Sequence, residues 1–287
     1  MKLFLIRHAE SEHNVAQVYA GTTDSALTNH GMVQIQRLAL HFKTQGVEFT
    51  TVFSSDLLRA RTTAEGICGL AGGEERDGAV SPLLPIILPI LRERDFGSLE
   101  GKSWLAVRGR VGNSVSETAG EPESHTSVAS RVDLFLTEHL LPVLRDNSRT
   151  AQSVAVVSHG ILLSALWEAL SRLFLSKHVV LGPGVEVVKR ISSWSNTGYL
   201  ELAVGWVEDV LSAPDSAKEG SHAQNASNIA EERPDVLNSP LHSHTMTVLT
   251  INGRQHLSNL RRTPGVGSSK HDGTQQRIDN FFQKPKN

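Results

Sequence analysis

Four apolar runs, each ending in a polar motif, constrain the fold more than any other feature of this chain. The runs cover residues 2–6, 51–53, 86–91 and 153–157. Helical patterns of apolar residues alternate with them, as expected of helices that connect parallel strands. We therefore predict an α/β protein with three layers, α/β/α, and a mainly parallel central sheet. Ligands of such sheets bind at the carboxyl ends of the strands, where the polar motifs fall.

The apolar spacing also predicts individual elements. Thr28 can cap a helix, and the apolar residues that follow it predict a helix over about residues 29–44. Similar patterns predict helices over residues 57–70, 103–110, 125–144 and 161–174. Later strands are predicted over residues 185–189, 199–204 and 245–251.

Composition divides the chain after residue 212. Residues 1–212 form the predicted catalytic domain, and residues 213–244 are rich in Ser, Asn, Glu, Pro and His. Such a segment buries too little apolar surface to order itself, which predicts a disordered insertion. Residues 245–261 are expected to complete the same domain with a strand and a return segment. Residues 262–287 are expected to form a flexible tail.

The overall composition excludes several functional classes. The chain has 287 residues and a net charge of −2, so it has no global attraction for nucleic acid or an anionic membrane. No apolar run approaches the roughly 20 residues of a membrane span. Cys68 is the single cysteine, which excludes an internal disulfide and suits a reducing compartment. These features predict a cytoplasmic protein, with the nucleus as an additional location, that contacts neither nucleic acid nor membrane.

The polar motifs supply the groups that phosphoryl transfer requires. A phosphate with about two negative charges needs donors that stay cationic at neutral pH, and Arg7 and Arg59 meet that need. His8 can attack phosphorus through an unprotonated ring nitrogen. The departing oxygen needs a proton, and Glu93 is the candidate general acid. Because this set works without a metal ion, we predict a metal-free site.

Two assignments have structural alternatives. His159 precedes Gly160 at a predicted helix start, where free N–H groups favour anions. The alternative is a core histidine bonded to a carbonyl. Glu93 has an alternative as the ion-pair partner of Arg92 or Arg94.

Together the motifs resemble those of the histidine phosphatase superfamily, which includes cofactor-dependent phosphoglycerate mutases and many metabolite phosphatases. The matching stretches are Leu5-Ile6-Arg7-His8-Ala9-Glu10-Ser11, Ser54-Ser55-Asp56-Leu57-Leu58-Arg59-Ala60, Leu91-Arg92-Glu93-Arg94-Asp95-Phe96-Gly97 and Val156-Val157-Ser158-His159-Gly160. The resemblance implies the phosphoglycerate mutase-like fold.

The resemblance also implies a role for each central residue. His8 is expected to form a phosphohistidine, while Arg7, Arg59 and His159 clamp the phosphate and Glu93 serves as the acid. This chemistry needs no bound cofactor.

Further phosphate contacts follow from the same resemblance. Asn14 and the main-chain N–H of Gly21 are expected to touch phosphate, as is Gly160 at its helix start. Mutases often carry Thr or Ser before that first glycine, and this chain has Ala20 there.

Three segments bring the resemblance closest to the TIGAR-like fructose-2,6-bisphosphatases. They are residues 91–102, Asn196-Thr197-Gly198, and the stretch from Asn252 through His256-Leu257 to Leu260. Glu100 stands where mutases have a different residue, which favours hydrolysis over phosphate shuttling. We therefore predict a phosphatase for small phosphorylated metabolites such as fructose-2,6-bisphosphate. A phosphoglycerate mutase is the alternative within the enzyme class.

The tail carries a second functional signal. Gln275, Ile278, Phe281 and Phe282 resemble the peptide motif that docks on the eukaryotic sliding clamp, PCNA. One helical turn would place the three apolar side chains on one face, and Gln275 could bond a rim carbonyl. One alternative is that this turn caps its own domain. Another is that the whole protein is an accessory protein of PCNA with a phosphatase-like domain.

Overall fold

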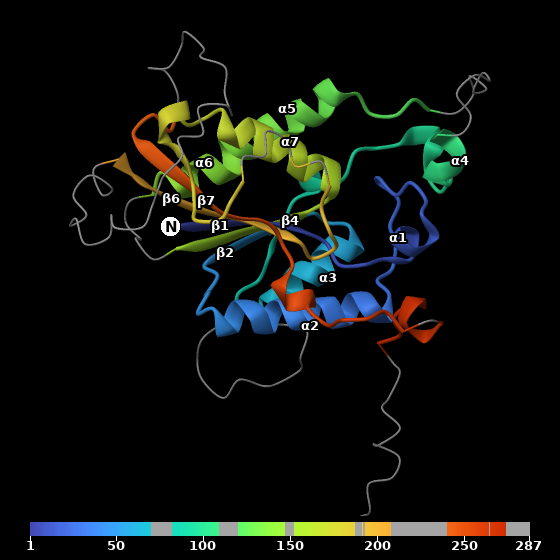
Figure 1. Ribbon diagram of the computed structural model, residues 1–287. Helices are drawn as coiled ribbons and strands as arrows, with labels where there is room; N and C mark the ends of the chain where they lie inside the picture. Colours follow the sequence, from blue (N-terminus) through green and yellow to red (C-terminus); the bar gives the residue numbers. More distant parts are fainter. Residues whose placement is uncertain are drawn as a thin grey trace, which may run out of the picture.

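A computed structural model describes the catalytic domain and its return segment. The described residues are 1–69, 82–108, 120–146, 152–186, 191, 193–207, 240–263 and 265–273. Within them, seven strands form one sheet in the order β3-β2-β4-β1-β6-β7-β5. Helices cover both faces of this sheet (Figure 1), which confirms the predicted three-layer α/β fold.

The parallel half of the sheet carries the four motifs. β1 (Lys2–Arg7) pairs in parallel with β4 (Ser153–Ser158), and β4 pairs in parallel with β2 (Thr51–Ser54). β3 (Ile86–Ile87) lies parallel at the edge. It is shorter than predicted because Pro89 begins a 3-10 turn. The motifs that follow these four parallel strands therefore lie together, at the carboxyl ends of the strands.

The later half is mixed in direction. β6 (Tyr199–Trp206) runs antiparallel to β1, and β7 (His244–Gly253) runs antiparallel to β6. The outer strand is β5 (Val179–Leu181), parallel to β7. The predicted strand over 185–189 is wrong in position, since residues 185–186 are not in a strand and the rest lie outside the described residues.

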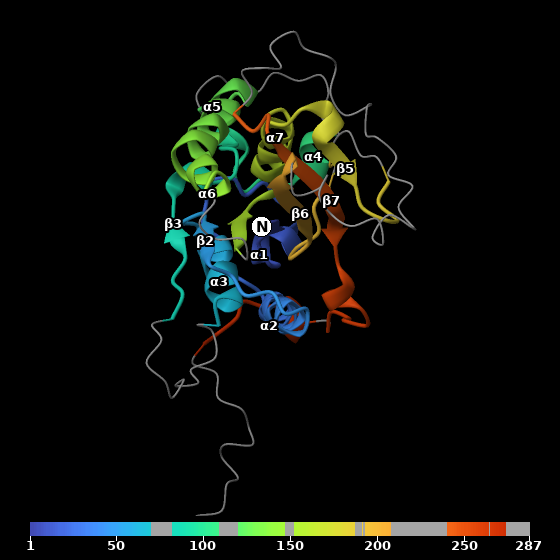
Figure 2. The same cartoon turned by 90° about the vertical axis from the view of Figure 1, so that its left-hand side faces the viewer.

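Two long helices cover one face of the sheet (Figure 2). α2 (Asn29–Thr44) begins where predicted, with the Thr28 side chain accepting the N–H of Gly31. α3 (Leu58–Ile67) follows β2. Their apolar sides pack on alternate residues of β1, including Phe4.

Helices on the opposite face contact the other residues of β1. The predicted helix over 125–144 is continuous but contains a π-helical segment, so it comprises α5 (His125–Phe135), η3 (Leu136–Leu140) and α6 (Leu141–Leu144). α7 (Gly160–Ser171) follows β4. Leu3 and Leu5 of β1 lie in this core.

Two short helices lie at the edge of the sheet that carries the motifs. α1 (Glu12–Ala16) follows the first motif and was not predicted, and α4 (Trp104–Arg108) covers the described part of the helix expected over 103–110. None of the helices within the described ranges is long and apolar enough to cross a bilayer.

The return segment is ordered further than the sequence suggests. At the end of the expected insertion, Leu241 is fully buried and His244 begins β7, while residues 213–239 lie outside the described residues. The expected flexible tail is also folded at its start, because Ser269 and His271 bond the main chain at the beginning of α2. The tail is held here by hydrogen bonds, which the apolar content of a sequence does not reveal.

Candidate active site

The two central strands bring the two histidines together. In the parallel pairing of β1 and β4, Arg7 lies opposite Ser158. The N–H of His8 donates to the carbonyl of Ser158 at 3.0 Å. The ring centroids of His8 and His159 are consequently 5.0 Å apart.

His8 is held as an unprotonated imidazole. Its Nδ1 lies 2.7 Å from the carbonyl oxygen of Ala9, so Nδ1 donates and Nε2 keeps its lone pair. Burial, and then the charges of Arg59 and Arg7, lower the pKa of His8 well below its usual range. The side chain is only 4% exposed. These contacts favour a neutral imidazole whose lone pair is on Nε2.

A serine contacts the second histidine. The Nε2 of His159 lies 3.0 Å from Oγ of Ser55, which accepts the N–H of Leu57. The hydroxyl proton of Ser55 is therefore free to go to Nε2, and in that tautomer Nδ1 carries the ring proton. This Nδ1 is buried and has no partner among the described residues. In this tautomer it is a hydrogen-bond donor. The role of His159 in phosphate binding stays a prediction.

Arg59 is fully buried and organises the loop of residues 20–23. Its guanidinium donates to the carbonyls of Thr23, Ala20 and Gly21 at 2.9, 3.1 and 2.8 Å. Burial lowers the pKa of Arg59 to about 10, which still leaves it charged at neutral pH. Three of the five N–H groups of a guanidinium are used, so two remain for a ligand.

Arg7 and Asn14 both present unused donors. Nη1 of Arg7 donates to the carbonyl of Trp194, but its buried Nε has no partner among the described residues. The Oδ1 of Asn14 accepts from the main chain of Ser11 and from Nδ2 of Asn196. With its oxygen occupied, Asn14 can turn only its N–H₂ group toward a ligand.

Glu93 lies at the N-terminus of α7. Its carboxylate accepts the N–H groups of Ile161 at 3.0 Å, Leu162 at 3.1 Å and Arg94 at 2.9 Å. Neither guanidinium suggested by the alternative assignment pairs with it in the ion pairs of the described chain: Arg92 instead pairs with Asp56. Glu93 is 8% exposed, and its carboxylate is held by these main-chain donors at the start of the helix.

The predicted phosphate donor of Gly21 already has a protein partner. The N–H of Gly21 donates to the carboxylate of Glu100 at 2.9 Å, together with the N–H groups of Thr22 and Thr23. Glu100 thus occupies the main-chain donor of Gly21, which the resemblance assigned to phosphate. A glycine is required at position 21, since a Cβ would lie 2.1 Å from the carbonyl oxygen of Arg94. Gly160, in contrast, stands at the first turn of α7, where expected.

The assembled groups offer hydrogen-bond donors to an anion. Within the described residues, no cluster of three or more His, Cys, Asp or Glu side chains could hold a metal ion. The unpartnered buried atoms, Nε of Arg7 and Nδ1 of His159, are donors instead. A buried donor without a partner costs about 1–3 kcal/mol, which a bound anion would recover.

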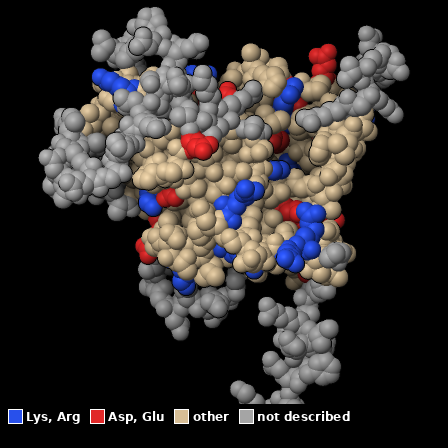
Figure 3. All heavy atoms as spheres, in the orientation of Figure 1, with Lys and Arg blue, Asp and Glu red and all other residues tan. Residues whose placement is uncertain are grey.

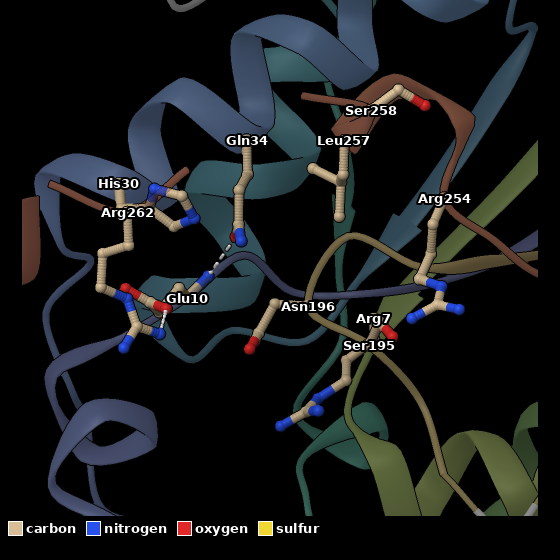
Figure 4. Close-up of a pocket in the computed structure, with 10 residues that line it drawn as sticks. All are labelled: Arg7, Glu10, His30, Gln34, Ser195, Asn196, Arg254, Leu257, Ser258 and Arg262. Carbon is tan, nitrogen blue, oxygen red and sulfur yellow. Dashed lines mark hydrogen bonds and ion pairs between the residues drawn. The ribbon is translucent and has the colours of Figure 1, made fainter. Parts of the chain in front are cut away.

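A cationic pocket of about 610 Å³ is lined by Arg7 and Asn196 (Figure 4). Through Arg7 it adjoins the predicted phosphate clamp, which consists of Arg7, Arg59 and His159. Two more arginines line the pocket, Arg254 and Arg262, and Arg262 pairs with the buried carboxylate of Glu10. Figure 3 shows basic side chains over η7 (Gln255–Leu257) and the N-terminal end of α2. Arg254 has no bonding partner for its guanidinium among the described residues.

A second pocket, of about 370 Å³, adjoins Glu93, and acidic side chains outnumber basic ones in its lining. It is lined by Thr22, Pro89, Arg92, Glu93, Asp95, Glu121, Glu123 and Arg131. Both of its arginines are in ion pairs, Arg92 with Asp56 at 2.5 Å and Arg131 with Glu123 at 2.8 Å. Among the described residues, the lining of this pocket therefore offers no unpaired cation.

The predicted site residues do not include several residues of this centre. Ser55 stands inside a quoted motif, but nothing in the sequence pairs it with His159. Asn196 and Arg254 come from segments far from the motifs along the chain. The tail residues Gln275, Ile278, Phe281 and Phe282 lie outside the described residues.

Relatives of the chain carry both phosphatase and mutase names. The "Probable phosphatase" of Schizosaccharomyces pombe is 27% identical over 98% of this chain and 79% of its own length. A 2,3-bisphosphoglycerate-dependent phosphoglycerate mutase of Bartonella henselae is 32% identical over 67% of this chain and 92% of its own length.

Solved structures support the fold. A mycobacterial hydrolase covers 88% of this chain and 98% of its own, with a TM-score of 0.55 and 20% identity. A mycobacterial glucosyl-3-phosphoglycerate phosphatase covers 71% of this chain and 92% of its own, with a TM-score of 0.54 and 21% identity.

The family profile matches the part of the chain that builds the clamp. The profile of the histidine phosphatase superfamily (branch 1) covers residues 3–184. This range contains both histidines, Arg7, Arg59 and Glu93. The chain belongs to branch 1 of the histidine phosphatase superfamily.

Proposed function

We propose that the protein hydrolyses phosphate monoesters of small metabolites through a phosphohistidine on His8. The observation that carries this proposal is the neutral His8, with its Nε2 lone pair available, among buried donors that have no partner within the described residues.

The reaction proceeds in two displacements. Nε2 of His8 attacks phosphorus, the bond to the ester oxygen breaks, and Glu93 gives its proton to the departing alcohol. Water then attacks the phosphohistidine while Glu93 takes up a proton, and inorganic phosphate leaves. The donors of Arg7, Arg59 and His159 accelerate both steps to the extent that they bind the transition state more tightly than the substrate.

A panel of phosphorylated metabolites tests this proposal. We expect release of inorganic phosphate that is lost in His8→Ala and unaffected by EDTA. A phosphoglycerate mutase would instead convert one phosphoglycerate isomer into the other with little free phosphate. Conversion without hydrolysis would therefore favour the mutase alternative.

The two pockets suggest that the substrate carries a second anionic group. The pocket beside Arg7 contains the unpaired Arg254, whereas both arginines of the pocket beside Glu93 already have carboxylate partners. A second phosphate is therefore attracted to the side of Arg7. Fructose-2,6-bisphosphate, or a related small sugar bisphosphate, is our proposed substrate class.

Arg254→Ala tests this substrate class. It should raise KM for a sugar bisphosphate about tenfold and leave KM for the corresponding monophosphate unchanged, since one charge-assisted bond is lost. Arg261→Ala is the matched control, because Arg261 is exposed nearby but does not line the pocket. Equal effects on both substrates would contradict a second anion in this pocket.

We further propose that the tail binds a sliding clamp through Gln275, Ile278, Phe281 and Phe282. The support is the sequence motif alone. The full chain should bind purified PCNA, and the double change Phe281→Ala and Phe282→Ala should abolish binding without changing phosphatase activity. Equal binding by this variant would exclude the motif as the contact.

A further inference from the structure

The loop of residues 195–198 supports the main chain of the nucleophile. The N–H of Thr197 donates to the carbonyls of Arg7 and His8 at 3.1 and 3.2 Å, and the N–H of Arg7 donates to the carbonyl of Gly198 at 3.1 Å. The carbonyl of His8 accepts a further bond from Nδ2 of Asn196 at 3.1 Å. The position of the imidazole therefore depends on this loop.

The same loop orients the ligand-facing amide. Nδ2 of Asn196 also donates to Oδ1 of Asn14 at 3.0 Å. This bond fixes which end of the Asn14 amide is occupied and leaves its N–H₂ group for phosphate. Asn196 thus connects the nucleophile and one arm of the clamp.

The loop adopts a backbone conformation that needs outside support. Thr197 is fully buried and has φ +56°, in the left-handed region that a β-branched residue rarely adopts. Such a conformation costs about 1–3 kcal/mol. The surrounding contacts must therefore hold the loop in place.

One support comes from His256 in η7. Oγ1 of Thr197 donates to the carbonyl of Asn196 at 2.7 Å, so it can only accept from Nε2 of His256, which lies 2.9 Å away. This requires the tautomer with a proton on Nε2. Burial, and then the nearby His41, lower the pKa of His256 to about 4, so the ring is neutral at physiological pH.

The other support comes from Asn252 near the end of β7. Its Oδ1 accepts the N–H of Ser195 at 3.0 Å. The packing is close enough that a Cβ on Gly198 would lie 2.2 Å from the same oxygen. Asn252 itself has φ +48°, in the left-handed region that asparagine adopts more readily than most residues.

We propose that His256 and Asn252 are positioning residues for phosphoryl transfer, which hold the loop of residues 195–198 against Arg7 and His8. This inference rests on the proposed function of the same site. It extends the catalytic support beyond residue 184, where the family profile ends. Because attack on phosphorus requires close alignment, a small displacement of His8 should slow the chemical step.

His256→Leu removes the donor while keeping an apolar side chain of moderate size. We expect kcat to fall about ten- to a hundredfold with little change in KM, and a slower burst of phosphohistidine. His256→Gln retains an amide donor and should recover most of the loss. His139→Leu is the control, since the ring of His139 in η3 lies against Phe53 and Phe135 on the opposite face of the sheet.

A substrate-independent measurement separates this inference from the proposed function. The ¹⁵N resonances of the His8 ring should shift in His256→Leu and remain unchanged in His139→Leu. Unchanged His8 resonances together with wild-type kcat would overturn the inference. If the wild type hydrolyses nothing, the proposed function fails, while the resonances still decide whether His256 positions His8.

A second variant protects the test against a folding defect. If His256→Leu does not fold, Asn252→Ser releases the other end of the same loop. It should lower kcat and shift the His8 resonances in the same direction as expected for His256→Leu. A folded Asn252→Ser protein with wild-type values of both would also overturn the inference.

Discussion

At His8, the carbonyl of Ala9 determines which ring nitrogen keeps its lone pair. The bond from Nδ1 to Ala9 leaves the lone pair on Nε2, and the two nearby arginines disfavour its protonation. In the proposed reaction, the same cations therefore bind phosphate and keep His8 neutral. In that reaction, the protonation of His8 and the binding of phosphate depend on the same two arginines.

The tautomer of His159 gives a prediction at this scale. Ser55→Ala removes the hydroxyl that faces Nε2, so the ring proton is no longer directed to Nδ1. We expect kcat/KM to fall about tenfold, the value of one hydrogen bond, and the ¹⁵N resonances of His159 to change. Ser54→Ala is the control, because its hydroxyl donates to the carbonyl of Ser55 instead. An unchanged tautomer in Ser55→Ala would contradict this role.

Proton donation by Glu93 gives another prediction. Glu93→Gln should lower kcat at least about a hundredfold for sugar phosphates, whose alkoxide leaving groups need a proton. The loss should be much smaller for a nitrophenyl phosphate, whose leaving group is stable as an anion. Steady-state kinetics with both esters provide the comparison. An equal loss with both would show that Glu93 acts in some other way.

At the scale of elements, the loop of residues 20–23 is held from two sides. Its N–H groups bind the carboxylate of Glu100, and its carbonyls bind the guanidinium of Arg59. Glu100 therefore supports the loop that holds the guanidinium of Arg59. The family resemblance identifies the glycine in this loop, but only the structure shows that a carboxylate occupies its N–H group.

The N-terminus of α2 gives a stability prediction. Thr28 is fully buried, caps the helix and donates to Oε1 of Glu10 at 2.8 Å. Thr28→Ala should lower the free energy of unfolding by about 1–3 kcal/mol, measured by urea denaturation. Thr44→Ala, at the exposed C-terminal end of the same helix, should change it little. Equal effects of the two changes would contradict the role of the cap.

At the scale of the whole molecule, buried histidines make the fold sensitive to acid. The pKa values of His8, His159 and His256 are all lowered, mainly by burial. Below about pH 6.5 the unfolded chain binds more protons than the folded one, so the free energy of unfolding should fall as the pH decreases from 7 to 5. Most carboxylates titrate below this window and contribute little to it.

Urea denaturation at several pH values checks this expectation. The slope between pH 7 and pH 5 should be smaller in His256→Gln, because that variant has one fewer histidine to protonate on unfolding. Stability that is constant or rises toward pH 5 would contradict the buried, neutral state of these rings.

Local patterns predicted much of the fold and of the clamp. The helix after Thr28 and the strands before the motifs follow from short-range periodicity, and the motifs place His8 and His159 at one edge of a sheet. The contacts of Ser55, His256 and Arg254 could not be predicted in this way. Each joins segments whose distance in the fold depends on the path of the later strands.

Trapping of the phosphoenzyme tests the central claim most directly. After brief mixing with substrate and quenching in denaturant, the wild type should carry acid-labile, base-stable phosphate on His8. His8→Ala should carry none. Phosphate that survives acid, or label that persists in His8→Ala, would contradict phosphoryl transfer through this imidazole.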